Sequence, residues 1–576
     1  MLRSALLSVV ICACLVESRR PSSRKASRPP HIIFLFADDV GWNDVSFHGS
    51  RQIPTPNLDA LAAWGVVLQR HYSMPTCSPS RTALMTSYYP SRTSVGHMVY
   101  PAAPKGALEL RFKLLPQWLK DLGYRTHMLG KWHLGYKSIE YTPTWRGFDT
   151  FFGYYNGEGY YFNHTVAWQG HCGLDMWHNI GHRVQPVTNL TGVYSTSAYT
   201  NQARKIITDH DTNKPLFLYV AYEAAHSTCN GCTPEAPQEE VDKFAYIEAS
   251  NRTFFAGAVD VMDQSIGQVL EALQSRGMLA DSVVVFASDN GAGPLASAAA
   301  EFPNAGSNWP LRGAKEGQWE GGVRTPALFW SGRALKDLPR APSQQVVHLV
   351  DWAPTFYAAA GGDASKLGDV DGKDLWRALS TGTEKDRGDV IVELEGHKQM
   401  SAIISGRYKL VYRPEGPDDP QLDGRVPPPR GQPPDDLDLD ALMKSSAAWK
   451  ALQSAARDGG HGTSSAPMPN WRQKAVLHCS KGNESANDES VASNFDPYDA
   501  VFVFDIFGDP CETKNLASAR TEVRDKLLKK LDRYRRAFHP RPGNNETDER
   551  GFPDRHRCLW EPWLGVKPAP YQNCSC

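Results

Sequence analysis

The sequence predicts an α/β protein, in which a mostly parallel central sheet is covered by helices on both faces and a smaller α+β unit follows. Apolar runs typical of strands alternate with amphipathic segments typical of helices from about residue 30 to 385, as in a parallel sheet. After residue 385, short strand-like runs follow one another closely, which favours an antiparallel sheet. We therefore expect one domain over residues 31–385 and a second over 386–576.

In the first domain, three segments are nearly continuous apolar runs, as expected of strands that helices cover on both faces. These runs are residues 31–36, 215–220 and 282–286. A helix is predicted where leucines recur at helical spacing before Gly123, namely at Leu115, Leu119 and Leu122. A second helix ends near Gly277 and has one apolar face, formed by Met262, Ile266, Leu270 and Leu273.

In the second domain, four apolar runs predict the strands of an antiparallel sheet, at residues 390–394, 401–405, 408–412 and 501–504. A helix is predicted over 521–538. Residues 413–475 interrupt this pattern with stretches rich in Pro, Gly and Asp around a short helical patch at 437–452. Because its hydrophobicity is too low for a core, we interpret this segment as a flexible insertion.

The composition is that of a soluble globular protein, with 41% hydrophobic and 22% charged residues in a chain of 576. A net charge of −1 argues against a nucleic-acid partner and against a polybasic membrane protein. Residues 1–18 predict a secretory signal peptide, because Arg3 precedes an apolar run that is too short to span a bilayer. Residues 19–30 then predict a loose basic leader, and no later segment predicts a membrane span.

The cysteines also indicate the secretory pathway. Of eleven cysteines, Cys12 and Cys14 belong to the signal peptide and Cys77 to a reactive motif. The eight that remain are an even number suited to disulfides. Their pairing stays open, although Cys229 and Cys232 favour a small disulfide loop. Sequons for N-glycosylation occur at Asn163, Asn189, Asn251, Asn483 and Asn545.

Residues 77–81, which read Cys-Ser-Pro-Ser-Arg, predict a helix start that presents one reactive side chain. Ser78 suits the N-cap and Pro79 the first turn. Cys77 would then lie at the positive end of the helix dipole, beside backbone N–H groups that favour an anion. Arg81, one turn later, offers a forked cation for a tetrahedral oxyanion. A thiolate nucleophile also suits this position, so a cysteine hydrolase is one interpretation.

Polar residues follow two of the predicted parallel strands at the point where each strand ends. Asp38 and Asp39 come after the first strand, and Asp289 and Asn290 come after the strand at 282–286. Taken alone, either group is commonly a solvated turn. Because the carboxyl ends of parallel strands meet at one edge of the sheet, the oxygens together suit a hard cation such as Ca²⁺ or Mg²⁺.

Cations and histidines follow other predicted strands. Lys131 and His133 come after a short strand at 124–129, and His226 comes after the strand at 215–220. Lys315 lies in a Gly-rich loop. The lysines offer charge to a sulfate or phosphate, and the histidines can carry a proton. A lone histidine after a strand is more often structural, and a loop lysine is more often a solvated surface residue.

These residues resemble the motifs of the sulfatase family, in which the cysteine of Cys-X-Pro-Ser-Arg is oxidised to formylglycine during secretion. The matching stretches occur in the family's order, at residues 37–42, 77–81, 130–135, 288–291 and 309–322. Residues 146–153, 194–196 and 308–313 look most similar to the arylsulfatase B group, the lysosomal N-acetylgalactosamine-4-sulfatases. One stretch departs from the family: Thr86-Ser87-Tyr88 stands where Thr-Gly-Arg or Thr-Gly-Lys is usual.

The resemblance implies an alkaline-phosphatase-like first domain and a role for each candidate residue. Ca²⁺ would be held beside the modified cysteine by Asp38, Asp39, Asp289 and Asn290. Arg81 would steady the formylglycine hydrate, and His133 would hydrogen-bond it and help to release sulfate. Lys131, His226 and Lys315 would hold the sulfate ester, and His226 or Lys315 would assist the leaving oxygen.

We therefore expect a Ca²⁺-dependent sulfate-ester hydrolase, acting on N-acetylgalactosamine-4-sulfate units of chondroitin or dermatan sulfate and on small aryl sulfates. Its expected partners are that sulfated substrate and the enzyme that generates formylglycine, and its expected location is lysosomal or extracellular. The alternative is a secreted, catalytically silent glycan-binding or matrix protein on the same fold. The full set of candidate catalytic residues counts against that alternative, because binding alone does not require them.

Overall fold

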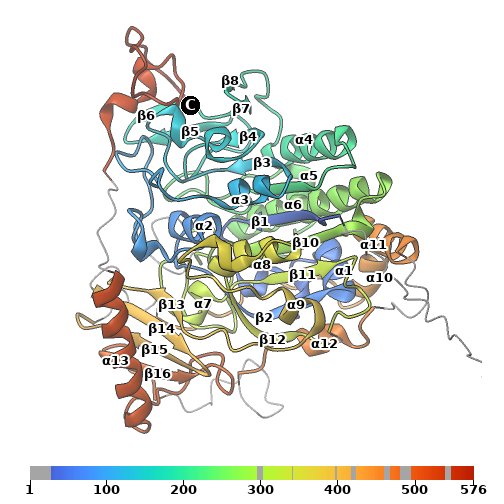
Figure 1. Cartoon of the computed structure of the whole chain (residues 1–576), viewed down its shortest axis with the longest axis vertical. Helices are drawn as coiled ribbons and strands as arrows, with labels where there is room; N and C mark the ends of the chain where they lie inside the picture. Colours follow the sequence, from blue (N-terminus) through green and yellow to red (C-terminus); the bar gives the residue numbers. More distant parts are fainter. Residues whose placement is uncertain are drawn as a thin grey trace, which may run out of the picture.

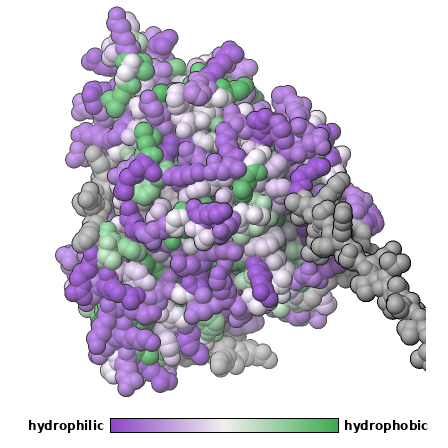
Figure 2. Space-filling model, viewed as in Figure 1, coloured by the Kyte–Doolittle hydropathy of each residue, from purple (hydrophilic) through white to green (hydrophobic). Residues whose placement is uncertain are grey.

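The computed structural model describes residues 28–294, 303–339, 341–395, 399–416, 423–459, 467–479, 494–538 and 546–576. The predicted signal peptide, most of the predicted leader and the sequons at Asn483 and Asn545 lie outside these residues. Within the described part, no helix combines the length and the apolar character needed to cross a membrane. The face in Figure 2 is mostly hydrophilic, with small and scattered apolar areas.

The first domain is built on a ten-stranded sheet with the strand order β12-β2-β11-β10-β1-β9-β3-β4-β7-β8. At its centre, β1 (His31–Ala37) pairs in parallel with β10 (Ser282–Ser288) and β9 (Leu216–Ala221). β3 (Arg125–Lys131) and β4 (Thr150–Tyr154) extend the parallel part beyond β9. The outer strands are β12 (Ser343–His348), β2 (Val66–Tyr72), β11 (Ala327–Ser331), β7 (Trp177–Ile180) and β8 (Arg183–Pro186).

This arrangement confirms the predicted α/β class with a mostly parallel sheet. The three apolar runs of the sequence are the three central strands, and every residue of β1, β9 and β10 is buried. Antiparallel pairs occur only toward the edges of the described sheet, for example between β10 and β11 and between β4 and β7. The carboxyl ends of β1, β3, β9 and β10 therefore lie at one edge.

Helices cover the two faces of the sheet (Figure 1). One group packs together as α1 (Pro56–Trp64), α4 (Ser195–Asp209), α5 (Gln238–Asp242) and α6 (Ser250–Ser275). The other group comprises α2 (Cys77–Thr86), α3 (Leu115–Asp121), α8 (Trp352–Ala359) and α9 (Trp376–Thr381). The predicted apolar face of α6 is buried, and α3 ends just before Gly123, whose φ of +87° is easy for glycine.

The second sheet has four antiparallel strands, as predicted. They are β13 (Val390–Glu393), β14 (Ser401–Ser405), β15 (Tyr408–Tyr412) and β16 (Val501–Asp505). Helix α13 (Thr521–Phe538) packs against β14 and β15. Side chains of this sheet share a core with Tyr72, Trp319 and Val323 of the first domain. The domain boundary at residue 386 stays a prediction.

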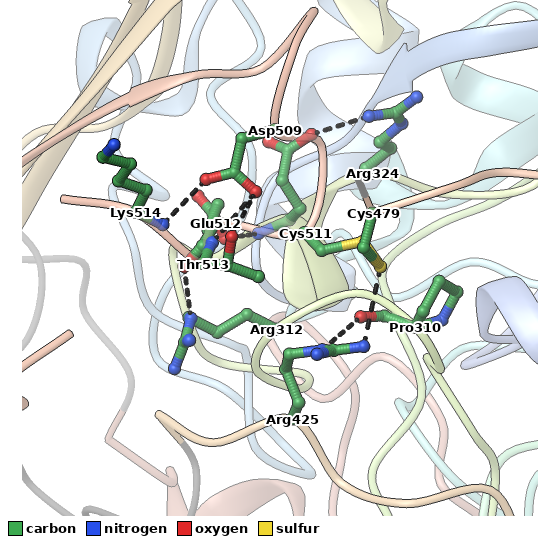
Figure 3. The surroundings of a disulfide bond; sticks show 11 residues. Pro310, Arg312, Arg324, Arg425, Cys479, Asp509, Cys511, Glu512, Thr513 and Lys514 are labelled. Carbon is green, nitrogen blue, oxygen red and sulfur yellow. Dashed lines mark hydrogen bonds and ion pairs between the residues drawn. A yellow bond between two sulfur atoms is a disulfide. The ribbon is translucent and has the colours of Figure 1, made fainter. Parts of the chain in front are cut away.

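Buried ions join this second sheet to the loop that carries Lys315. The Nζ of Lys409, in β15, contacts Glu320 Oε1 at 3.0 Å and Glu512 Oε1 at 2.9 Å, and all three side chains are buried. Arg312 donates to the backbone oxygen of Glu512 at 2.9 Å. Figure 3 shows that Glu512 follows directly after the Cys479–Cys511 disulfide, which fixes this part of the chain.

Part of the segment predicted as a flexible insertion is instead packed. Helices α10 (Leu439–Ser445) and α11 (Ala447–Asp458) occupy it, and α11 lies against α1 and α6 (Figure 1). The buried residues of α11 recur at helical spacing: Ala448, Ala451, Leu452, Ala455 and Ala456. The prediction is wrong over residues 439–458, because four of the five are alanines, which add little hydrophobicity yet allow close helix packing.

Eight of the described cysteines form four disulfides: Cys172–Cys576, Cys229–Cys232, Cys479–Cys511 and Cys558–Cys574. The predicted small loop at Cys229 and Cys232 is thus confirmed. The chain's C-terminus is tied beside the hairpin of β5 (Thr165–Trp168) and β6 (His171–Leu174) (Figure 1). Among the described cysteines, Cys77 alone is free, and it is buried.

The packing of α11 can be tested at Leu452, whose side chain is fully buried. Leu452→Ala leaves a cavity, so we expect the free energy of unfolding in urea to fall by about 2–5 kcal/mol. Leu442→Ala, in α10, is the control: that side chain is 36% exposed, and the cost should not exceed about 1 kcal/mol. Equal effects of the two substitutions would contradict the packing of α11.

Candidate active site

The predicted oxygen ligands meet at the carboxyl edge of the central sheet. Ala37 and Ser288, the last residues of β1 and β10, are paired in register. Asp38, Asp39, Asp289 and Asn290 therefore emerge side by side, and all four are fully buried. The backbone N–H of Asp39 donates to Asp289 Oδ1 at 3.1 Å. Asp39 has a φ of 57°, a left-handed conformation that aspartate tolerates better than most residues.

Helix α2 places Cys77 beside this edge. Cys77 is the first residue of the helix, as predicted, and its Sγ lies 3.8 Å from Asp38 Oδ1. The predicted N-cap is wrong: Thr76, with an extended backbone, precedes the helix, and Ser78 is already its second residue. The Ser78 hydroxyl instead accepts a hydrogen bond from the N–H of Tyr100 at 3.2 Å. Pro79 lies in the first turn, as predicted.

Helix α2 ends at the place where the chain departs from the family pattern. Ser87, at the C-cap, has a φ of 61° and is fully buried. A left-handed residue at this point suits the glycine usual in the family, and costs a residue with a side chain roughly 1–2 kcal/mol. Ser87 offsets this by donating from its hydroxyl to the carbonyl of Val350 at 2.7 Å. The substitution therefore keeps the end of the helix.

Arg81 and Lys131 neutralise two of the carboxylates. Lys131 Nζ lies 2.6 Å from Asp38 Oδ2. Arg81 contacts Asp289 at 2.8 Å and Asp38 at 3.4 Å, and it also donates to the backbone oxygen of Lys131 at 3.2 Å. All of these side chains are buried. Arg81, one helical turn after Cys77, therefore extends to the acidic edge of the sheet.

Lys315 neutralises the third carboxylate and contacts His226. Its Nζ lies 2.7 Å from Asp39 Oδ2 and 3.1 Å from His226 Nε2. His226 Nδ1 lies 2.7 Å from the carbonyl of Ser227, which can only accept, so the proton resides on Nδ1 and Nε2 accepts from Lys315. Burial, followed by Lys315 and Lys131, holds the pKa of His226 well below its ordinary value. His226 is thus a neutral acceptor.

The Asp39 carboxylate keeps Lys315 protonated. Burial lowers the pKa of Lys315, but the Asp39 carboxylate outweighs burial and holds that pKa well above its ordinary value. Lys315 is therefore a cation, and it is the better proton donor of the two groups predicted to assist a leaving oxygen.

His133 also has a defined tautomer. Its Nε2 lies 2.8 Å from the carbonyl of Tyr100, so Nε2 carries the proton. Its Nδ1 is buried and has no hydrogen-bond partner among the described residues. Burial and Lys131 hold the pKa of His133 well below its ordinary value. His133 thus offers one bare acceptor nitrogen to a group bound beside Lys131.

Cys77, His133, His226 and Lys315 line one pocket of about 420 Å³. Its other walls include residues that were not predicted as site residues from the sequence, namely Tyr100, Glu158, Val166, Trp168, Gln318 and Glu393. These residues are brought together by loops, by β5 and by β13 of the second sheet, so no single local motif could identify them. The pocket has the size and mixed polarity of a small-ligand site.

The Cys77 thiol itself is a poor nucleophile in this setting. Burial raises its pKa to about 12, against the opposing effect of Lys131 and Lys315. The helix N-terminus therefore does not produce a thiolate here, because desolvation dominates. The burial of Cys77 therefore argues against the interpretation as a cysteine hydrolase.

The acidic edge fits a hard divalent cation. Four residues each place one possible ligand atom within 4.8 Å of the others: Asp38, Asp39, Cys77 and His226. Asn290 Oδ1 is buried close by without a hydrogen-bond partner among the described residues, whereas its Nδ2 donates to Asp39 Oδ1 at 2.6 Å. His226 Nε2 is engaged by Lys315, so the donors that remain are mainly oxygens, as Ca²⁺ or Mg²⁺ prefers.

The buried ion pair of Lys131 and Asp38 can be tested against an exposed one. Lys131→Met leaves a buried carboxylate without its nearest cation, so the free energy of unfolding in urea should fall by about 3–5 kcal/mol. Lys205→Met breaks the pair with Asp209, in which the side chains are 68% and 62% exposed, and should cost at most about 1 kcal/mol. A loss below 1 kcal/mol for Lys131→Met would contradict the buried pairing.

Known proteins are similar to this chain in sequence, and solved structures are similar to it in fold. The chain is 32% identical over 563 residues to arylsulfatase J of Mus musculus, covering 95% of this chain and 82% of that protein. It is 33% identical over 399 residues to N-acetylgalactosamine-6-sulfatase of Homo sapiens, covering 67% and 72%.

Arylsulfatase A of Homo sapiens is 30% identical over 410 residues, covering 68% of this chain and 76% of that protein. The crystal structure of Ps i-CgsB in complex with k-i-k-neocarrahexaose superposes with a TM-score of 0.57 at 27% identity, covering 77% of this chain and 95% of that one. The profile of the Sulfatase family matches residues 30–362. The chain therefore belongs to the sulfatase family and is a sulfuric ester hydrolase.

Proposed function

We propose that this protein hydrolyses sulfate esters of glycans with Ca²⁺ and with a formylglycine hydrate formed from Cys77. The observation that carries the proposal is the position of Cys77, in one pocket with Lys315, His133 and His226 and 3.8 Å from Asp38. A merely structural cysteine needs neither the carboxylates nor the cations around it.

Asp38, Asp39, Asp289 and Asn290 are the residues that would hold Ca²⁺. Bound there, the ion would lower the pKa of a hydroxyl of the residue 77 hydrate, so that this hydroxyl could attack sulfur. Three carboxylates face three cations in the cluster, namely Arg81, Lys131 and Lys315. A divalent cation would make this balanced cluster positive, which favours an anionic ester.

The cations then bind the sulfate and serve the leaving group. Lys131 and Lys315 offer ammonium groups to the sulfate oxygens, and Arg81 steadies residue 77 from one helical turn away. Lys315 donates a proton to the oxygen of the departing alcohol. The neutral His226, which accepts from Lys315 at 3.1 Å, orients that ammonium group. His133 Nδ1 accepts a hydrogen bond from the hydrate.

The pocket also suits a sugar. Val166 and Trp168 supply an apolar wall, and Trp168 is fixed by a hydrogen bond from its Nε1 to Thr547 Oγ1 at 3.0 Å. Such an aromatic ring can pack against the C–H face of a sugar. We propose N-acetylgalactosamine-4-sulfate, at the end of chondroitin or dermatan sulfate, as the natural substrate. The likeness to an N-acetylgalactosamine-6-sulfatase supports the sugar and leaves the sulfate position to experiment.

We further propose that the protein passes through the secretory pathway to the lysosome or the extracellular space. Within that pathway, the formylglycine-generating enzyme modifies Cys77. Its four disulfides support an oxidising compartment. Among the predicted glycosylation sites that the structure describes, Asn189 is exposed, and Asn163 and Asn251 are half-buried. Their glycosylation stays a prediction.

The proposal is tested by mass spectrometry of the peptide that contains Cys77, from protein secreted by a eukaryotic cell. We expect the mass of the aldehyde or its hydrate, together with hydrolysis of 4-nitrophenyl sulfate. Cys77→Ala should abolish this hydrolysis, because it removes the nucleophile. A matched control, Cys229→Ala with Cys232→Ala, removes a disulfide whose cysteines do not line the pocket, and should keep most of the activity.

An unmodified thiol in protein made with ample maturation enzyme, and no hydrolysis of the aryl sulfate, would overturn the proposal. Such a protein that still bound sulfated glycans would instead match the silent glycan-binding alternative.

A further inference from the structure

The pocket carries acidic as well as cationic side chains. Three glutamates from three different segments line it: Glu158 after β4, Glu316 next to Lys315, and Glu393 at the end of β13. None of them is one of the three carboxylates of the acidic edge, Asp38, Asp39 and Asp289. A pocket for an anionic ester thus contains groups that repel anions, and this combination needs an explanation.

Glu393 is the most informative of the three because it comes from the second domain. Its side chain is buried, with 7% of its surface exposed. The pairing of β13 with β14 shifts register between Ile391 and Glu393, so the ladder is irregular, as at a β-bulge, where the strand reaches the pocket. Bulges of this kind re-aim side chains beside active sites. The second sheet therefore contributes a carboxyl group to a pocket whose reactive groups all come from the first.

The partner of Glu393 is neutral. Gln318 Nε2 donates to Glu393 Oε2, and the Gln318 side chain is itself buried. Glu393 makes no ion pair with any residue in the described ranges. A buried carboxyl without a counter-charge is unfavourable for folding, and burial raises its pKa to about 7. Carboxyl groups whose burial is unfavourable for folding are typical of binding sites.

We propose that Glu393, supported by Glu158 and Glu316, makes the pocket select a sugar that carries one sulfate and no second anion beside it. The carboxylate accepts a hydrogen bond from a sugar hydroxyl or an acetamido N–H, and it repels a further sulfate or a uronate carboxylate. This inference rests on the proposed function, since it takes the sulfated sugar as the ligand, and it narrows the substrate to singly sulfated residues.

The test measures binding, so that it does not depend on turnover. In a Cys77→Ala background, isothermal titration calorimetry at pH 8.5, where Glu393 is ionised, compares N-acetylgalactosamine-4-sulfate with N-acetylgalactosamine-4,6-disulfate. We expect the disulfated sugar to bind at least about tenfold more weakly, which corresponds to 1.4 kcal/mol. Adding Glu393→Gln, which keeps the size and the amide partner, should shrink that ratio by roughly the same factor.

A second pocket variant and a control variant complete the test. Glu158→Gln should shrink the ratio in the same direction, and it covers the case in which Glu393→Gln does not fold. Glu239→Gln removes the same charge from an exposed position in α5, outside the pocket, and should leave the ratio unchanged.

Equal affinities for the two sugars, no binding of either, or a ratio that neither pocket variant changes would overturn the inference. If the wild-type protein hydrolyses 4-nitrophenyl sulfate in that case, the sulfatase proposal survives on its own. Conversely, a protein that shows the expected ratio but no hydrolysis would retain the charge selection and lose the proposed activity.

Discussion

The structure of the site depends on the balance of three buried carboxylates against three buried cations at one edge of the central sheet. Asp38, Asp39 and Asp289 are fully buried, and an uncompensated carboxylate there would cost several kcal/mol. The in-register pairing of β1 with β10 puts the carboxylates together. The cations come from elements far apart in the sequence, and this charge balance therefore fixes where α2, the end of β3 and the loop of Lys315 must lie.

The same charge balance bears on which ligands the site would attract or repel. In the proposed function, a divalent cation held by the carboxylates would leave the cluster with excess positive charge, so an anionic ester would be attracted to it. The neutral tautomers of His133 and His226 add acceptors without adding charge. At the same time, the carboxyl groups of Glu158, Glu316 and Glu393 line the pocket. Under the charge selection proposed above, attraction and repulsion in one small pocket would give selectivity rather than simple affinity for anions.

Site residues could be predicted from the sequence wherever they lie at the end of a recognisable strand or helix. Asp38 and Asp289 follow the buried strands β1 and β10, and Lys131 is the last residue of β3. Because parallel strands end at one edge of the sheet, the meeting of these residues could be predicted. The cap of α2 was mispredicted because Thr76 and Ser78 are both good capping residues and only the backbone decides between them. The wall residues Trp168 and Glu393 have no local signal, since tertiary contacts alone bring them to the pocket.

The central claim is that the acidic edge binds Ca²⁺ beside a modified residue 77. A crystal structure of the secreted protein, with anomalous data sensitive to calcium, tests it most directly. We predict an anomalous peak about 2.3–2.6 Å from oxygens of Asp38, Asp39 and Asp289, and electron density for a geminal diol at residue 77. A plain thiol at residue 77, with no cation on these carboxylates, would contradict the account.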